Sequence, residues 1–281
     1  MQNSVVGIDL GGTNIRVAVV TENKIQAMQT SRIDAAGSYD SILQTVYAVT
    51  DTVVTSSVAA IGIGVPSVVD LDTGVVYDVQ NIPAWTEVPL KKLMEERYRI
   101  PVFVNNDANC FALGEAYFGQ GKEATSIIGV TLGTGLGAGI IINRKLYAGS
   151  NCGAGEFGMV PYLDKFIEWY ASGQFFFNQY GRRGDEVYAA AKAGDAQALA
   201  MYETFGFHLG HALKTIMYTY DPSLVIFGGS VRHAYELFQK PMWQQLQTLV
   251  FPRSVARLQI KCSTLQNSGV LGAAALYYNA L

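Results

Sequence analysis

The chain has 281 residues, of which 49% are hydrophobic and 15% are charged, and its formal net charge is −3. This composition is typical of a globular protein with one large domain or two medium ones. The slightly acidic balance gives no basic surface for nucleic acid, so no nucleic-acid partner is expected.

The chain opens on a strand pattern that polar residues interrupt, VVGIDLGGTNIRVAVV at residues 5–20. Apolar residues flank Asp9 and a polar turn, so the pattern predicts a hairpin. Glycines give such a turn access to positive φ and let backbone N–H groups approach an anion. Asp9 would then hold a hydrated Mg²⁺ beside phosphates. The alternative is a plain hairpin that Asp9 caps.

Two further segments, residues 58–70 and 101–110, are predicted to be buried strands that run into turns. A helical pattern follows the second strand and ends at Gly119. Asp107 lies at this junction, where a carboxylate can accept a proton from a hydroxyl as a general base. A carboxylate in the same place can instead cap the helix. The residues alone leave both roles open.

Residues 124–143 carry no charge and have the small-residue spacings of some membrane helices. Five glycines between positions 129 and 139 would weaken such a helix, so no membrane segment is expected. A repeat explains the segment better, because IGVTLGTGLGAGIII (128–142) matches VGIDLGGTNIRVAVV (6–20) as strand, glycine-rich turn and strand. The repeat predicts two similar α/β domains.

The last third of the chain alternates between helices and strands. Residues 195–221 form one long helical pattern that is apolar nearly all round, and residues 268–280 form a terminal helix. Between them, residues 223–231 form a strand that enters a double-glycine turn. This alternation predicts mostly parallel or mixed sheets that are covered on both faces.

Six segments occur in the order seen in the ROK family of sugar kinases and sugar-responsive repressors: DLGGTN, GVPSVVD, NNDANC, GVTLGTGLGAG, GAGEFG and VIFGGSV. The chain thus resembles a ROK protein over essentially its whole length. The resemblance implies an α/β, actin-like ATPase (ribonuclease H-like) fold, with two similar domains and an interdomain cleft. The expected domains are residues 1–109 with 265–281, onto which the terminal helix packs, and residues 110–264.

The resemblance also implies ATP- and Mg²⁺-dependent phosphorylation of a hexose, with Asp107 as the catalytic base. The residues expected at the phosphates, the adenosine and the Mg²⁺ are Asp9, Gly11, Gly12, Thr13, Asn14, Gly133, Thr134, Gly135, Gly228, Gly229 and Ser230. Polar side chains that can pair with sugar hydroxyls are Asn81, Asn106, Asp107, Glu156 and Glu168. From the residues alone, the glycines around Glu156 favour a loop shaped around a ligand, with an exposed loop carboxylate as the alternative, and Glu168 is expected mainly through the resemblance.

The chain departs from the family directly after GEFG. Most members continue with a histidine and a cysteine-rich segment that together bind a structural zinc. Here Met159 takes the histidine position, and no cysteine lies between Cys152 and Cys262. A structural zinc requires thiolates and imidazole, so no zinc site is expected. A thioether cannot replace the hydrogen bonds of that histidine to the sugar, so the identity of the hexose stays open.

The cysteines and histidines otherwise suggest structural roles. Cys110, Cys152 and Cys262 lack metal-ligand spacing, and the start of the chain lacks the features of a signal peptide. We therefore expect reduced thiols and a cytoplasmic protein. The three histidines, His208, His211 and His233, have no further ligands at recognisable spacing.

Three classes of function follow. The first is a hexose kinase, with glucose as the leading substrate, and N-acetylmannosamine, N-acetylglucosamine, fructose or allose as alternatives. The second, a repressor, is disfavoured because such members carry a helix-turn-helix before the first phosphate loop, which here begins near residue 5. The third is a catalytically silent sugar or nucleotide sensor. A homodimer is left open, with FFFNQY (175–180) as interface or as core.

Overall fold

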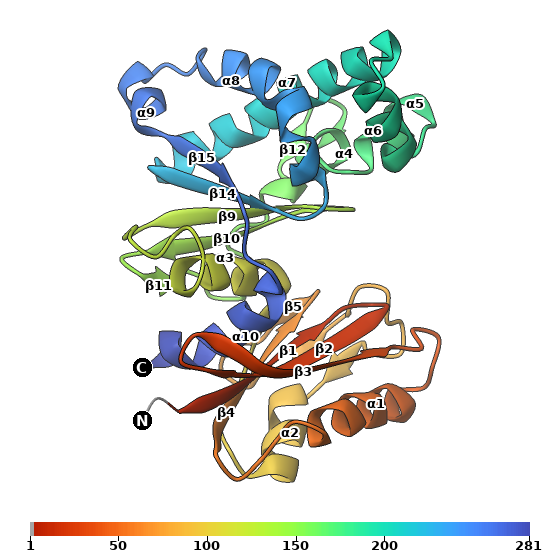
Figure 1. Ribbon diagram of the computed structural model, residues 1–281, viewed down its shortest axis with the longest axis vertical. Coiled ribbons are helices and arrows are strands. Elements are labelled where there is room, and N and C mark those ends of the chain that lie inside the picture. Colours follow the sequence, from red (N-terminus) through yellow and green to blue (C-terminus); the bar gives the residue numbers. More distant parts are fainter. Residues whose placement is uncertain (1–2) are drawn as a thin grey trace. The chain divides into compact units, whose positions relative to one another are not determined.

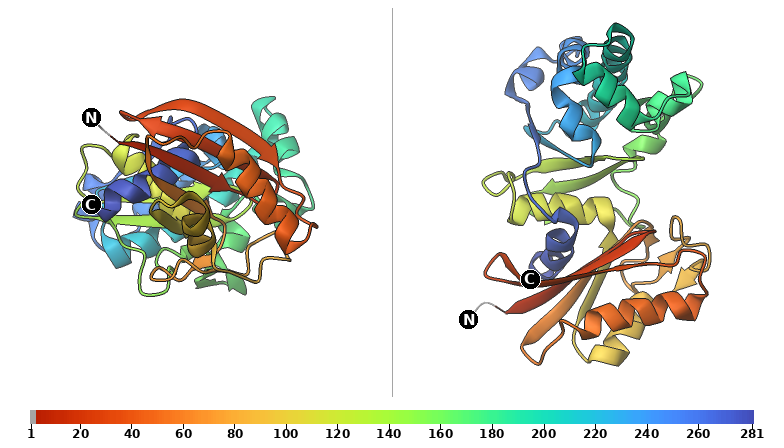
Figure 2. Two further views of the ribbon diagram at one scale, coloured as in Figure 1. Left: turned by 90° about the horizontal axis from the view of Figure 1, so that it is seen from below. Right: turned by 45° about the vertical axis from the view of Figure 1, so that its right-hand side comes forward.

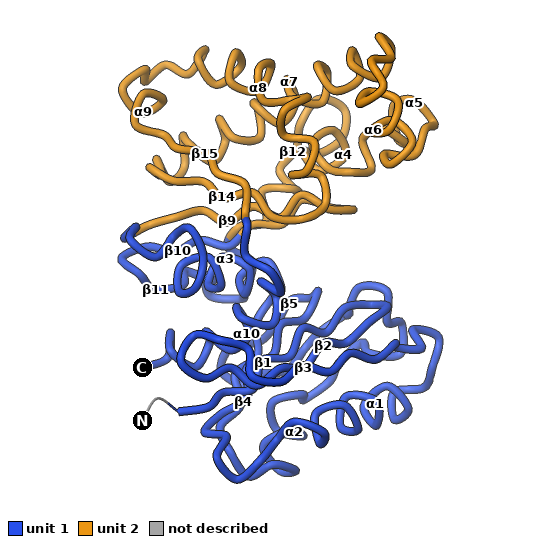
Figure 3. Tube along the Cα trace, in the orientation of Figure 1, with its two compact units in different colours: residues 1–125, 139–154, 264–281 blue, residues 126–138, 155–263 orange. Residues whose placement is uncertain are grey.

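The computed structural model describes residues 3–281, which separate into two compact units (Figure 3). Unit 1 comprises the described part of Met1–Thr125 together with Gly139–Ala154 and Thr264–Leu281. Unit 2 comprises Ser126–Ala138 and Gly155–Ser263. These units follow the density of contacts and differ in extent from the expected domains 1–109 plus 265–281 and 110–264, which stay a prediction.

Unit 1 contains a five-stranded sheet in the order β3-β2-β1-β4-β8. The strands are β1 (Ser4–Leu10), β2 (Asn14–Thr21), β3 (Lys24–Arg32), β4 (Val58–Val65) and β8 (Val102–Asn106). The first three pair antiparallel, whereas β4 runs parallel to both β1 and β8. The strands predicted within 58–70 and 101–110 are β4 and β8. Strand β4 is wholly apolar and β8 is apolar up to Asn105, because helices cover both faces of the sheet.

Helices α1 (Tyr39–Asp51) and α2 (Leu90–Tyr98) lie on one face of this sheet, and α10 (Ser268–Ala280) lies on the other (Figures 1 and 2). The backbone of α10 approaches the sheet directly. A Cβ atom at Gly62 would stand 1.8 Å from the carbonyl oxygen of Ala273. Only a residue without a side chain fits there, and the expected packing of the terminal helix on the first strands is confirmed.

Helix α3 (Asp107–Tyr117) follows β8 and packs against α10 within unit 1. Three short strands, β5 (Val68–Val69), β6 (Val76–Tyr77) and β7 (Glu87–Val88), form a small antiparallel sheet. The loop between β6 and β7 contributes Trp85, which is fully buried in the core of the unit.

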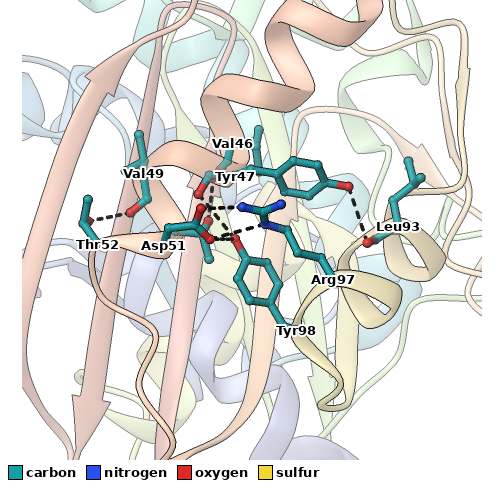
Figure 4. A network of polar contacts seen from close by, with 9 residues as sticks. Val46, Tyr47, Val49, Asp51, Thr52, Leu93, Arg97 and Tyr98 are labelled. Carbon is teal, nitrogen blue, oxygen red and sulfur yellow. Dashed lines mark hydrogen bonds and ion pairs between the residues drawn. The ribbon is translucent and has the colours of Figure 1, made fainter.

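A polar network joins the end of α1 to the end of α2 (Figure 4). The Asp51 carboxylate accepts two hydrogen bonds from Arg97, from Nη2 at 2.5 Å and from Nε at 3.3 Å. The hydroxyl of Tyr98 donates to the same carboxylate at 2.8 Å. The guanidinium carbon of Arg97 lies 4.5 Å from the ring centroid of Tyr47. The network therefore combines a bidentate ion pair with a cation–π contact.

A second five-stranded sheet has the order β11-β10-β9-β14-β15. Its strands are β9 (Ile127–Leu132), β10 (Leu136–Ile142), β11 (Lys145–Leu146), β14 (Leu224–Gly228) and β15 (Gln259–Cys262). Strand β14 runs parallel to both β9 and β15. In both sheets the order along the chain is third, second, first, fourth and fifth strand. The repeat seen in the sequence is therefore also a repeat of topology.

The long helix α7 (Ala196–Tyr220) is the helix predicted at residues 195–221. It begins where the side chain of Asp195 accepts a hydrogen bond from the N–H of Ala198 at 2.7 Å, and it packs against α8 (Tyr235–Leu246). The smaller elements of unit 2 are the strands β12 (Pro161–Tyr162) and β13 (Lys165–Phe166), the helices α4 (Ile167–Ala171), α5 (Phe175–Tyr180), α6 (Gly184–Lys192) and α9 (Pro252–Arg257), and the 3₁₀ turns Phe157–Met159 and Val231–Ala234. Within residues 3–281, no helix has the length and apolarity needed to cross a membrane.

Candidate functional site

The first glycine-rich turn joins β1 to β2, as expected. The N–H of Gly11 donates to the carbonyl oxygen of Asn14 at 2.9 Å and closes the hairpin. Neither Gly11 nor Gly12 has a positive φ, so the expectation of positive φ is wrong, whereas the approach of their N–H groups to an anion stays a prediction. The reason at Gly12 is space, because a Cβ atom there would stand 2.6 Å from Cβ of Asn81. Asn81, a predicted sugar ligand, thus packs against the turn, whereas Thr13 is exposed.

Asp9 lies on β1 just before this turn, opposite Arg16 on β2. Its Oδ2 atom accepts a hydrogen bond from Nη1 of Arg16 at 3.2 Å. The first turn of α10 comes so close that a Cβ atom at Gly269 would stand 2.8 Å from Cγ of Asp9. Burial raises the pKa of Asp9, and Arg16 offsets part of the rise. A carboxylate that has lost much of its water gains from a cation beside it.

Such a carboxylate fits Mg²⁺, which proteins commonly hold through one or two carboxylates, several waters and the phosphates of a substrate. The Asp9 carboxylate accepts from the side chain of Arg16 on β2, and this bond is not the one that a cap of the turn would make.

Asp107 is the first residue of α3 and is exposed at the end of β8. The N-cap of α3 is the residue before it, Asn106, whose Oδ1 atom accepts from the N–H groups of Ala108 at 2.8 Å and Asn109 at 3.4 Å. Oδ1 of Asp107 also accepts from the N–H of Ala108 at 2.8 Å, but the N-cap position considered for Asp107 belongs to Asn106. Its Nδ2 atom donates to the carbonyl oxygen of Ser67, which follows β4, at 3.2 Å.

Strands β1, β4 and β8 run parallel, so their carboxyl ends lie at one edge of the sheet. The turn at Gly11, the residues around Ser67 and the pair Asn106–Asp107 all follow these ends. Ligands of open α/β sheets bind at this edge. Unit 1 therefore gathers Asp9, Gly11, Gly12, Thr13, Asn14, Asn81, Asn106 and Asp107 from the predicted site residues.

The second glycine-rich turn joins β9 to β10 and is fixed by a carboxylate. Its own backbone closes through a hydrogen bond from the N–H of Gly133 to the carbonyl oxygen of Gly135 at 3.0 Å. Oε2 of Glu168 accepts from the N–H of Leu136 at 2.7 Å. A Cβ atom at Gly135 would stand 2.5 Å from the same Oε2 atom. Glu168, expected at the sugar, is thus also a structural partner of this turn.

Glu156 belongs to the same region of unit 2 as Glu168. Although Glu156 is exposed by surface area, its carboxyl group is partly buried. The resulting loss of water raises its pKa, and the negative charge of Glu168 adds to the rise. Two predicted sugar ligands therefore lie close enough to interact electrically.

Gly228 ends β14, and Gly229 follows in a left-handed conformation with φ 74°. A Cβ atom at Gly229 would stand 2.1 Å from the carbonyl oxygen of Leu132, the last residue of β9. The double-glycine turn and the second phosphate turn are therefore neighbours. Both border a cavity of about 810 Å³ within unit 2, to which Gly133, Thr134 and Ser230 contribute.

Sequence reasoning missed most of the wall of this cavity. The wall includes Gln174, Phe177, Arg183 and Tyr188 from α5, α6 and the segments beside them, and His233 from the 3₁₀ turn Val231–Ala234. The aromatic segment 175–180 was expected to be interface or core. In fact Phe175 and Phe176 are buried, whereas Phe177 is 65% exposed. An aromatic run followed by arginines was the available signal, but it has no fixed spacing.

Among the described residues, no three or more His, Cys, Asp or Glu side chains converge as a metal-binding group. The expected absence of a structural zinc stays a prediction.

A model of the ROK family matches residues 5–280 of the chain. The chain belongs to the ROK family. Its fold is accordingly the actin-like ATPase fold, as the strand order of the two sheets also indicates.

Named relatives of this ROK protein include two kinds of kinase. A glucokinase of Halalkalibacterium halodurans is 30% identical over 95% of the chain and 92% of its own length. An N-acetyl-D-glucosamine kinase of Yersinia enterocolitica is also 30% identical, over 96% of the chain and 98% of its own length. A crystal structure of a ROK glucokinase from Streptomyces griseus in complex with glucose and AMPPNP matches with a TM-score of 0.80, 30% identity, and coverage of 97% and 98%.

Proposed function

We propose that the protein is an ATP-dependent sugar kinase that phosphorylates a hexose hydroxyl, with glucose as the leading substrate. The observation that carries the proposal is the exposed Asp107 at the carboxyl end of β8, directly after the N-cap residue Asn106. Phosphoryl transfer needs a group that accepts the proton of the attacking hydroxyl, and an exposed carboxylate at such an edge can do so. Family membership and the named kinases among the relatives support the same activity.

The other residues take roles that follow from their chemistry. The N–H groups of the two glycine-rich turns would bind phosphate oxygens, and Asp9 would hold Mg²⁺ through water. The cavity beside Ser230 has aromatic and polar walls suited to the adenosine. Asn81, Asn106, Glu156 and Glu168 would bind sugar hydroxyls. Bound Mg²⁺ would neutralise charge on the phosphates during transfer.

The identity of the sugar is the finer part of the proposal. A glucokinase and an N-acetylglucosamine kinase are equally similar to the chain, each at 30% identity. Met159, which stands where most family members have a histidine, is 50% exposed and offers no strong hydrogen bond. N-acetylglucosamine is therefore the second candidate, and N-acetylmannosamine, fructose and allose remain in the panel of sugars to test.

The decisive measurement is ADP release with Mg-ATP against this panel, for the wild type and for Asp107→Asn. We expect sugar-dependent turnover that falls by roughly 10²–10⁴-fold in the variant, the usual value of a general base. Asp40→Asn is a matched control, because Asp40 is also an exposed carboxylate in the first turn of a helix. If the protein binds ATP or a sugar but phosphorylates no sugar of the panel, it is instead a sensor.

A further inference from the structure

A buried polar cluster lies directly behind the junction of β8 and α3, formed by Asn105, Asn109 and Cys152. The thiol of Cys152 donates to Oδ1 of Asn105 at 3.3 Å. Nδ2 of Asn109 donates to the same oxygen at 2.9 Å and lies 3.7 Å from Sγ of Cys152. All three residues belong to unit 1 and are buried.

Two features of the cluster are unfavourable taken alone. The backbone of Cys152 has a φ of 58°, a left-handed conformation that residues other than Gly, Asn and Asp rarely adopt. Oδ1 of Asn109 is buried and, within residues 3–281, has no hydrogen-bond partner. Turning the Asn109 amide over would not help, because Oδ1 of Asn105 would then face an oxygen in place of a donor. Local strain of this kind persists where the surroundings impose it, and it clusters at functional sites.

The cluster connects to Asp107 through the backbone. Oδ1 of Asn105, which takes the thiol and the amide, also accepts the N–H of Asn106 at 2.8 Å. Asn106 in turn caps α3, whose first residue is Asp107. The direction in which the Asp107 carboxylate leaves the sheet is therefore set by an oxygen that Cys152 and Asn109 hold in place.

We propose that Cys152 is a positioning residue for Asp107, and that its thiol–Asn105 hydrogen bond fixes the β8–α3 junction in the geometry that phosphoryl transfer needs. The effect on turnover rests on the proposed function, whereas the effect on the junction does not. A thiol suits this buried place because it behaves as a small apolar group that also carries a weak donor.

Three substitutions at position 152 separate the effect of the thiol hydrogen bond from the effect of the strained backbone. Cys152→Ala removes the donor and keeps the strain, Cys152→Gly removes both, and Cys152→Ser keeps a donor. We expect kcat to fall roughly 10-fold in the alanine and glycine variants, since small misplacements of reacting groups are costly, with KM for ATP unchanged. The serine variant should retain most of the activity. The glycine variant keeps the left-handed conformation accessible and should fold even if the alanine variant does not.

Amide hydrogen exchange provides a readout that does not depend on activity. In Cys152→Ala and Cys152→Gly, the amides of Asn106 and Ala108 should exchange at least several-fold faster than in the wild type, while the amide of Ile8 in β1 stays unchanged. Cys110→Ala is the matched control, because it removes another buried thiol from the same unit. It should leave the Asn106 amide as protected as in the wild type.

Unchanged exchange at Asn106 and Ala108 in both thiol-free variants would overturn the proposal, whatever the activity. Faster exchange spread evenly over β1 and α3 would also overturn it, because that would be general destabilisation. If the wild type phosphorylates no sugar, the proposed function fails, yet a local change in exchange still supports the role of Cys152 at the junction.

Discussion

Oε2 of Glu168 accepts a hydrogen bond from the backbone N–H of Leu136 at 2.7 Å, directly after the second glycine-rich turn. A residue expected to bind sugar therefore also holds the backbone of a predicted phosphate loop. Hydrogen bonds from backbone N–H groups to a carboxylate are stronger than those between neutral groups. The Glu168 side chain thus links predicted sugar binding to predicted phosphate binding inside unit 2.

Replacing Glu168 with alanine should weaken both functions, and glutamine should weaken mainly one. Glu168→Gln keeps an oxygen acceptor for the N–H of Leu136, so KM for ATP should stay within about 3-fold of the wild type. Glu168→Ala removes the acceptor and should raise KM for ATP roughly 10-fold or more, which corresponds to about 1.4 kcal/mol. Initial rates at varied concentrations of ATP and of sugar would separate KM for ATP from KM for the sugar. Glu203→Ala on the exposed side of α7 is the control. Equal KM values for ATP in both variants would contradict this link.

Gly12→Ala should destabilise unit 1 through a clash with Asn81. The added Cβ atom would stand 2.6 Å from Cβ of Asn81, and overpacking of this kind typically costs about 1–3 kcal/mol. Asn81 has a φ of 63°, which glycine adopts freely, so Asn81→Gly in the same chain should restore much of the loss. Urea unfolding of the single and double variants measures this. Gly133→Ala, with nothing within 4 Å of its added Cβ, should unfold like the wild type.

The network between α1 and α2 should contribute modestly to stability. Asp51 and Arg97 are 44% and 42% exposed, so water screens their bidentate pair and its contribution to stability is small. A double-mutant cycle with Asp51→Asn and Arg97→Met should give a coupling of that size, which falls in high salt. The hydrogen bond with Arg97 lowers the pKa of Asp51, so this contribution should vanish as the pH falls below the usual range of a carboxyl group. A coupling of zero at low salt would show that the pair adds nothing.

His208 should make the protein less stable in mild acid. Burial, with a smaller effect of His211, lowers the pKa of His208 from 6.5 to about 4, and its Nδ1 atom lies 3.1 Å from the hydroxyl of Tyr162. Between these two pH values the unfolded chain binds a proton that the folded chain excludes, so the free energy of unfolding falls as the pH drops from 6.5 towards 4. The whole shift corresponds to about 3 kcal/mol, reduced by partial exposure.

Unfolding at pH 7 and at pH 4.5 should therefore show a smaller pH dependence in His208→Gln than in the wild type. His233→Gln is the matched control, because His233 is exposed. Identical pH slopes for His208→Gln and the wild type would contradict the assignment.

The sequence was a reliable guide where a pattern depends on neighbouring residues. The long helix was expected at 195–221 and spans Ala196–Tyr220, because its apolar period and the Asp195 cap are local features. The repeated hairpin predicted two similar α/β domains, and the structure contains two sheets with the same strand order. Residue types in a fixed order were also sufficient to recognise the family.

Features that depend on packing between distant segments could not be foreseen. In NND, the sequence offers three adjacent polar residues, and only the path of the backbone decides that Asn106 caps the helix while Asp107 is exposed. The glycine at position 12 is required by Asn81, far away along the chain. The cavity wall at Phe177 and Arg183 arises from the way α5 and α6 fold back in unit 2.

The close fit of α10 against β4 has a consequence for how the chain is made. Residues 268–280 leave the ribosome after all of unit 2, yet their backbone completes the core of unit 1, where Ala273 meets Gly62. Since synthesis proceeds at about 5–20 residues per second, the first sheet must wait on the order of ten seconds with one apolar face uncovered. During that interval the nascent chain would be a substrate for chaperones, and unit 2, although synthesised later, would be the first to finish folding.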